Sequence, residues 1–428
     1  MSNTNLTLIR KGTIITHDKT IYDMDILIEN DKIIEVDINI NVDQCDVIEA
    51  EGLYIIPGLI DMHCELCEPG YDFRESFDTG GQAAIAGGFT ALTCNPMTNP
   101  VIDNKTVVEY VVNKGLNISP VAIYPYGALT KGNKGEDMTE IGGMQLKGIV
   151  AVSDGDISIQ DSKTLKRVLQ YASMFELPII LHCEDHSLSK AYGVNDGYIA
   201  TQLGLEGSMA ASETLMVAKY IAIAEELKIR IHLTHISTKE SVELIRAAKK
   251  RGVRMTSETS PQYFSLTEEA ISGYNTYAKV NPPLRQDADV KAIIKGLQDG
   301  TIDVISSDHQ PHNIDSKAIE FSLASNGISA LETALSVTYT YLVKPGYLTM
   351  EQLVEKMSHK PSHLLSLNKS FFGVGHLADL AIFDPESDFV VDATQFKSKA
   401  KHSPYHGMTL KGLMKYTFVE GKKYSLNI

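Results

Sequence analysis

The chain has 428 residues, of which 43% are hydrophobic, and 39 Lys and Arg against 54 Asp and Glu give a formal net charge of −15. The apolar fraction and the modest charge content exclude a wholly disordered chain. The acidic balance argues against a general polyanion-binding protein, because nucleic-acid affinity needs a dense basic face, but it leaves room for a small anionic substrate held by a few local groups.

Both ends of the chain have the pattern of short β-strands. Alternating or β-branched residues, separated by turns rich in Asp, Asn and Lys, occupy residues 6–9, 12–15, 24–28 and 32–36 near the start, and 378–383, 389–391 and 413–419 near the end. These two ends predict a small β-sandwich domain formed from residues 1–57 together with residues 366–428.

The long middle of the chain alternates helical patterns with apolar strand patterns. Strand-like segments at 178–181, 229–233, 253–256 and 303–306 each follow a helical pattern, at 162–174, 212–227, 241–250 and 290–297. Repeated β-α units of this length predict a parallel sheet, and this many predict a closed barrel. We therefore expect an α/β fold, with a (β/α)8 TIM barrel over residues 58–365.

The cellular setting is suggested by what the sequence lacks. Its five cysteines are too sparse for a secreted disulfide framework, no apolar segment of a signal peptide opens the chain, and no run approaches the roughly 18 apolar residues of a membrane helix. We expect a cytoplasmic protein with no membrane or nucleic-acid partner.

The first group of candidate functional residues follows the segment 58–62. Strand side chains alternate between faces, so His63, Glu65 and Cys67 share one side, which predicts three neighbouring metal ligands. The alternative is a buried histidine beside a partly solvated glutamate. The spacing of Cys64 and Cys67 also matches a redox C-x-x-C motif, although that motif normally opens a helix.

Four more predicted strands end in residues of the same chemical kind. They carry, in order, Asp154, His182, His235 and Asp308, and His312 follows the last of these. Each is ordinary alone, but the carboxyl ends of barrel strands build the active site, so together they indicate one cluster. Imidazoles and carboxylates suit Zn²⁺ or a similar divalent ion, and a carboxylate beside metal-activated water is typical of hydrolysis.

These residues lie within motifs that extend along almost the whole chain. The motifs occupy residues 58–63, 68–70, 86–90, 98–100, 130–132, 182–185, 235–238, 279–285, 307–309, 311–312, 331–333 and 378–380. In this order and spacing the chain resembles the class I dihydroorotases of the amidohydrolase superfamily. The resemblance implies zinc-dependent, reversible hydrolysis of dihydroorotate to N-carbamoyl-aspartate, a step of pyrimidine biosynthesis.

The resemblance also implies a role for each residue that matches a family position. One or two zinc ions would be bound by His63, Glu65, Asp154, His182, His235 and Asp308. Asp308 would be catalytic as well, because a carboxylate beside the metal can take a proton from water and pass it to the leaving nitrogen. Asn281 and His312 would bind substrate. For His232 we expect either a structural role or contact with a ligand-binding side chain, which is the commoner fate of a lone histidine.

Several positions depart from the family pattern. Glu65 replaces the second His of His-x-His-Leu-Arg and Cys67 replaces its Arg, while Met97 replaces an Asn that binds carboxylate. The family's Ser-Asp-Asp-Gly segment reads Ser-Asp-Gly-Asp, which leaves Asp154 and Asp156 both open as the ligand. The Cys67 thiol cannot form the bidentate pair of hydrogen bonds with a carboxylate that an arginine guanidinium forms. Arg74 could substitute for it, or could be an arginine on a surface helix.

These departures keep two other functions open. One is a catalytically impaired relative that acts as a scaffold for aspartate carbamoyltransferase, and the other is an amidohydrolase with a different cyclic amide substrate. The scaffold does not need the retained metal-site residues, which favours an enzyme. A homodimer is also expected, from the resemblance alone.

Overall fold

The computed structural model describes residues 6–189 and 193–426, and an eight-stranded parallel sheet forms its centre. The strands follow chain order: β6 (Leu59–Asp61), β7 (Phe89–Cys94), β8 (Ala122–Gly127), β9 (Ala151–Ser153), β10 (Ile179–Leu181), β11 (Ile231–Leu233), β12 (Met255–Thr259) and β13 (Val304–Ile305). Nearly every residue in them is buried, because helices cover the outer face and side chains fill the interior.

Residues just beyond β6 and β13 connect the first strand of this sheet with the last. The Ser307 amide donates to Asp61 Oδ1 over 2.8 Å, the Asp308 amide donates to the His63 carbonyl over 3.1 Å, and the Glu65 amide donates to the His309 carbonyl over 2.8 Å. The predicted barrel is thus confirmed, and its closure lies at the ends of the strands where the candidate residues are.

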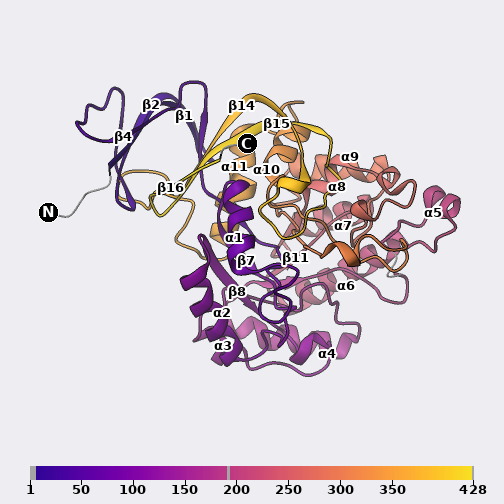
Figure 1. Ribbon diagram of the computed structural model, residues 1–428. Coiled ribbons are helices and arrows are strands. Elements are labelled where there is room, and N and C mark those ends of the chain that lie inside the picture. Colours follow the sequence, from indigo (N-terminus) through magenta and orange to yellow (C-terminus); the bar gives the residue numbers. More distant parts are fainter. Residues whose placement is uncertain (1–5, 190–192, 427–428) are drawn as a thin grey trace.

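The helices surround the barrel, as Figure 1 shows. They are α1 (Phe77–Ala86), α2 (Lys105–Ile118), α3 (Ile141–Gln145), α4 (Ser162–Ala172), α5 (Tyr198–Leu203), α6 (Ala210–Leu227), α7 (Lys239–Lys250), α8 (Pro261–Ser265), α9 (Asp287–Gln298), α10 (Ala334–Thr338), α11 (Met350–Val354) and α12 (Lys360–Leu364). In α7 the buried Val242, Ile245 and Ala248 recur at helical spacing, and the Thr238 hydroxyl caps the first turn. None of the helices described here has the length and apolarity needed to cross a bilayer.

The predicted β-domain from both termini is also present, as a second eight-stranded sheet of mixed direction. Its strands are β1 (Leu6–Ile15), β2 (Thr20–Glu29), β3 (Lys32–Asp37), β4 (Asp46–Glu49), β5 (Tyr54–Pro57), β14 (Leu380–Val390), β15 (Thr409–Val419) and β16 (Lys422–Ser425). The two ends of the chain meet where β5 pairs antiparallel with β14, and Figure 1 shows the indigo and yellow strands side by side.

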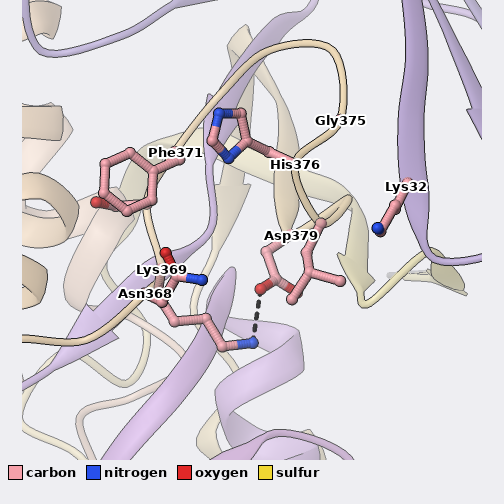
Figure 2. A pocket seen from close by; sticks show the side chains of 9 residues that line it. Lys32, Asn368, Lys369, Phe371, Gly375, His376 and Asp379 are labelled. Atoms are coloured by element: carbon pink, nitrogen blue, oxygen red, sulfur yellow. Dashed lines mark hydrogen bonds and ion pairs between the residues drawn. The ribbon is translucent and has the colours of Figure 1, made fainter.

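A pocket of about 170 Å³ lies beside this second sheet and is lined by Lys32, Lys369, His376 and Asp379, among others (Figure 2). Its buried cation is already paired, because Lys369 Nζ lies 2.7 Å from Asp379 Oδ2 and 3.4 Å from a Glu420 carboxylate oxygen. The charge of Lys369 is therefore neutralised within the pocket and is not left free for a ligand.

Candidate active site

Five side chains meet at the carboxyl ends of the barrel strands. Four of them were predicted as ligands from the sequence, and the fifth, Asp156, is the alternative that was left open beside Asp154. His63 follows β6, Asp156 follows β9, His182 follows β10, His235 follows β11 and Asp308 follows β13. Because parallel strands all end at the same edge of the sheet, residues far apart in the sequence converge there. The result is one buried cluster of imidazoles and carboxylates.

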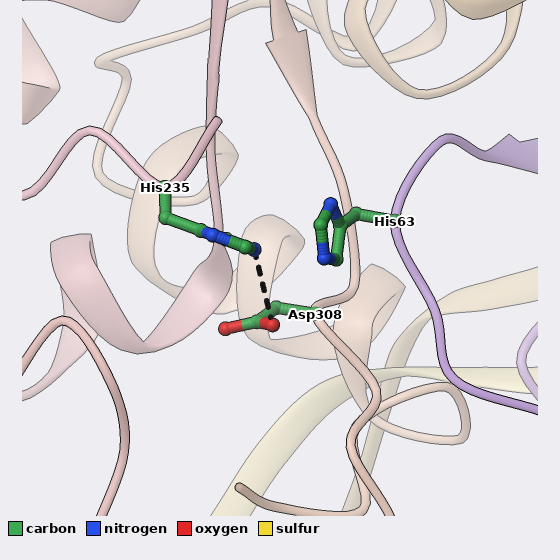
Figure 3. Close-up of side chains that lie close together, drawn as sticks. All are labelled: His63, His235 and Asp308. Carbon is green, nitrogen blue, oxygen red and sulfur yellow. Dashed lines mark ion pairs between the residues drawn. The ribbon is translucent and has the colours of Figure 1, made fainter. Parts of the chain in front are cut away.

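The cluster contains two overlapping groups of candidate metal ligands. His63, His235 and Asp308 form the first (Figure 3), and Asp156 and His182 share His235 in the second; within each group the ligand atoms lie within 4.8 Å of one another. His235 is central, since its Nε2 lies 3.2 Å from Asp308 Oδ1 and its Nδ1 lies 3.2 Å from His182 Nδ1. Both ring nitrogens of His235 thus face candidate ligands.

The residues of this cluster fit a divalent metal ion. Asp156 Oδ1, His235 Nε2 and Asp308 Oδ1 are buried, and none has a hydrogen-bond partner within the described part of the chain. A buried polar atom without a partner costs free energy, and a bound cation would supply that partner. Imidazole nitrogens and carboxylate oxygens are also ligands that zinc accepts. A cluster of candidate metal ligands is therefore present at the carboxyl ends of the barrel strands.

Asp156 is held ionised by its neighbours. Burial alone would raise the pKa of this carboxyl, but the nearby imidazoles of His63, His235 and His182 outweigh burial and hold the pKa well below its usual range. Asp156 Oδ1 lies 3.6 Å from His63 Nε2. An ionised carboxylate is the form that binds a cation.

Asp154, the residue placed in the ligand set from the sequence, has different contacts. Its Oδ1 accepts a hydrogen bond from the Thr130 amide over 2.8 Å, and its Oδ2 accepts one from the Thr130 hydroxyl over 2.6 Å. Burial raises the pKa of Asp154 to about 6. Gly155 between the two acids has φ +64°, and this left-handed turn directs Asp156 into the cluster in place of Asp154.

The two predicted substrate-binding residues lie around the cluster. Asn281 Nδ2 donates to Glu184 Oε2 over 3.1 Å, and the same oxygen lies 3.3 Å from His182 Nε2. His312 Nε2 lies 2.6 Å from the Asn326 carbonyl oxygen, to which it must donate because a carbonyl only accepts. Asn281 thus reaches the second ligand group through a carboxylate, whereas His312 contacts a neighbouring loop.

Comparisons with known proteins assign the family. The family model described as "Dihydro-orotase-like" matches residues 52–241. A dihydroorotase from Acetivibrio thermocellus is 50% identical over 398 residues, and one from Ruminiclostridium cellulolyticum is 49% identical over 397 residues; each alignment covers 93% of this chain and 93% of the relative. This chain belongs to the dihydroorotase family. The predicted family and its enzyme class, the cyclic amidohydrolases, are confirmed.

Solved structures agree with the dihydroorotase fold described above. The L-hydantoinase (dihydropyrimidinase) from Arthrobacter aurescens superposes with a TM-score of 0.88 at 25% identity, covering 98% of this chain and 97% of that one. The dihydropyrimidinase from Brevibacillus agri has a TM-score of 0.87 at 22% identity, covering 99% and 95%. The second likeness supports the fold alone.

Two residues that depart from the dihydroorotase pattern lie beside the cluster. Within the described residues, Glu65 is in neither ligand group; its Oε2 instead accepts from Arg74 Nη2 over 2.7 Å. Arg74 precedes α1 and its side chain is only 18% exposed, so the alternative of a surface-helix arginine is wrong. Burial raises the pKa of the Cys67 thiol well above its usual value, which disfavours the reactive thiolate that a redox motif needs.

The sequence did not single out the carboxylate that orients His63. Glu258, on β12, lies between two imidazoles, with Oε1 3.4 Å from His63 Nδ1 and Oε2 3.3 Å from His232 Nε2. A carboxylate at Nδ1 keeps the proton there and leaves the Nε2 lone pair of His63 free to bind a metal. An acidic residue inside a buried strand was the one sequence signal that could have revealed it.

Replacing Glu258 with glutamine is expected to weaken metal binding by about 10- to 100-fold, because a neutral amide holds the Nδ1 proton of His63 less firmly. Metal affinity measured by competition with a chelator checks this result. Glu226 lies on the exposed side of α6, so the Glu226→Gln protein is the matched control and should bind metal as wild type does. Equal affinities in all three proteins would contradict the orienting role.

Gln262 also contacts the cluster. It lies at the start of α8, and its Nε2 donates to Asp308 Oδ2 over 2.6 Å. The other oxygen of Asp308 faces His235. Gln262 therefore engages Oδ2 of Asp308, and Oδ1 is left without a hydrogen-bond partner among the described residues.

Two buried lysines hold the loop that follows His312. Lys279 Nζ donates to the Phe321 and Ala324 carbonyls over 2.7 and 2.5 Å, and Lys317 Nζ donates to the Ser325 and Gly327 carbonyls over 2.8 and 2.9 Å. These bonds satisfy backbone oxygens that would otherwise be buried without partners. The lysines thereby support the segment whose Asn326 carbonyl binds His312.

Lys317 is expected to make stability depend on pH. Burial, with the nearby charge of Lys279, lowers the pKa of Lys317 to about 7, whereas an unfolded lysine titrates near 10.4. At pH values between these two pKa values, Lys317 is neutral when folded and protonated when unfolded, so unfolding takes up a proton. The unfolding free energy of wild type, relative to that of Lys317→Met, should therefore rise by up to about 1.4 kcal/mol per pH unit. Denaturant unfolding at pH 7 and 9 measures this difference. The exposed Lys250→Met serves as control and should follow wild type; parallel pH profiles for wild type and Lys317→Met would refute the expectation.

Proposed function

We propose that this chain is a metal-dependent dihydroorotase that reversibly hydrolyses dihydroorotate to N-carbamoyl-aspartate in pyrimidine biosynthesis. The observation that carries the proposal is the buried His63, His235 and Asp308 group in a chain 50% identical to a dihydroorotase along almost its full length. The barrel, residues 58–365, would form the catalytic unit, and residues 1–57 with 366–428 the supporting β-domain.

The metal ligands in this proposal come from both groups. His63, His235 and Asp308 would bind one zinc ion, and Asp156 and His182, with His235, would bind a second where two are present. Asp156 takes the place first given to Asp154, because both oxygens of Asp154 are engaged by Thr130. Zinc bound there would polarise the ring carbonyl and make water more acidic.

The proton transfers would be carried out by Asp308. In hydrolysis, the amide C–N bond of the ring breaks, hydroxide adds to the carbonyl carbon, and a proton goes to the nitrogen. Asp308 would accept that proton from water and deliver it to the leaving nitrogen, while Gln262 holds its Oδ2 in place. Asn281 and His312 would contact substrate at the edge of the cluster.

The proposal is tested with the purified protein by metal analysis and by following N-carbamoyl-aspartate formation from dihydroorotate. We expect bound zinc and turnover that a chelator removes and added zinc restores. A metal-free, inactive protein that co-purifies with aspartate carbamoyltransferase would instead support the scaffold role, which Cys67 and Met97 favour. A zinc-loaded protein active only on another cyclic amide would support a changed substrate. A homodimer stays a prediction.

A further inference from the structure

A dihydroorotase needs a cation for its substrate, because dihydroorotate carries a carboxylate. The acids at this end of the barrel do not supply it, since Asp156 and Asp308 belong to the two ligand groups and Glu65 is paired with Arg74. Without a local cation the substrate carboxylate would be desolvated beside these acids at a large cost.

His312 does not supply that charge. Burial, with the charges of Arg74 and Lys317, lowers the pKa of His312 to about 2, so its imidazole is neutral. Its Nε2 hydrogen is used by the Asn326 carbonyl, which lies 2.6 Å away. His312 is therefore left with an acceptor nitrogen, Nδ1, which would repel a carboxylate.

Three other buried cations of this region are already occupied. Lys279 and Lys317 donate to the carbonyls of the loop that follows His312. Arg285 donates from Nε to the Ser237 hydroxyl over 3.2 Å and from Nη1 to Asn195 Oδ1 over 2.8 Å, and its Nη2 lies 4.0 Å from a carboxylate oxygen of Glu213.

Arg74 differs from these cations because one side of its guanidinium is free. Its Nε donates to the Pro311 carbonyl over 3.0 Å and its Nη2 donates to Glu65 Oε2 over 2.7 Å, which fixes the plane of the group. Nη2 also lies 3.4 Å from His312 Nε2, so the guanidinium reaches a predicted substrate-binding residue. Nη1 donates to no other described residue.

We propose that Arg74, held in place by Glu65 and the Pro311 carbonyl, binds the substrate carboxylate through its free Nη1 edge and selects anionic over neutral cyclic amides. This assignment rests on the proposed function and deepens it. It also gives Glu65 a role as the positioning partner of Arg74, and it explains how the site tolerates Cys67 where the family pattern has an arginine. A guanidinium suits this task because its rigid fork matches a carboxylate.

The test compares wild type, Arg74→Met and Arg74→Lys on dihydroorotate and on dihydrouracil, which has the same ring without the carboxylate. Losing a buried charged partner should raise KM for dihydroorotate about 100-fold in Arg74→Met, with a much smaller change in kcat. The Arg74→Lys protein should be intermediate, because it keeps the charge but not the fork. In Arg74→Met, the activity on dihydrouracil relative to that on dihydroorotate should increase by a similar factor. The exposed Arg230→Met should behave as wild type.

The binding of dihydroorotate to zinc-loaded wild type and Arg74→Met is measured in parallel by calorimetry, so that the two proposals can fail separately. Binding without turnover by wild type would overturn the proposed activity, while a weaker affinity in Arg74→Met would still support Arg74. Unchanged affinity and KM in a folded Arg74→Met protein would overturn the assignment to Arg74 alone. Wild type that binds no dihydroorotate would overturn both. If Arg74→Met does not fold, the Arg74→Lys protein decides the question. A ratio of dihydroorotate to dihydrouracil activity equal to that of wild type would overturn the assignment.

Discussion

Replacing Asp308 with asparagine is expected to lower kcat for dihydroorotate hydrolysis by about 10²- to 10⁴-fold. An amide cannot accept the proton from water, and it is also a poorer ligand than the carboxylate that faces His235 at 3.2 Å. Steady-state kinetics in both directions of the reaction measure the loss, because the same group must act in each.

The structure provides a matched control for this substitution. Asp315 lies in the loop that follows His312, is exposed, and is outside both ligand groups, so Asp315→Asn should retain wild-type kinetics. The melting temperature of Asp308→Asn should stay close to that of wild type, since the amide still fits beside Gln262. Substantial turnover by a folded, zinc-loaded Asp308→Asn protein would remove Asp308 from the mechanism.

Replacing Asp156 and Asp154 one at a time is expected to separate a metal ligand from a structural carboxylate. Asp156→Asn removes the charge that faces His63 at 3.6 Å, so the bound zinc should decrease and activity should fall at least about 100-fold. Metal analysis by mass spectrometry and activity at fixed zinc concentration measure both effects.

The Asp154→Asn protein is the counterpart, with a different expected defect. Its amide nitrogen would face one of the two Thr130 donors, so unfolding free energy should fall by about 1–3 kcal/mol while zinc content is kept. Thermal unfolding with and without added zinc measures the difference. A protein that loses zinc through Asp154→Asn but not through Asp156→Asn would reverse the assignment made here.

Much of the active site could be predicted from the sequence because its signals are local. An apolar run that ends in a histidine or aspartate indicates a barrel strand with a functional residue at its carboxyl end, whatever lies elsewhere in the chain. His63, His182, His235 and Asp308 all follow this pattern, and the structure brings all four together. The β-domain from both termini was likewise visible as alternating segments at the two ends.

The features of the site that could not be predicted from the sequence depend on contacts between distant segments or on a single backbone angle. The left-handed Gly155 determines that Asp156 and not Asp154 faces the histidines. Barrel closure brings Glu258 to His63, and the segment before α1 brings Arg74 to Glu65 and His312. The sequence by itself therefore determined the barrel, the family and the residue types of the site. The tertiary structure decided which carboxylate faces the metal cluster and which cation is left free, because those choices depend on strand register and loop geometry, which no local pattern records.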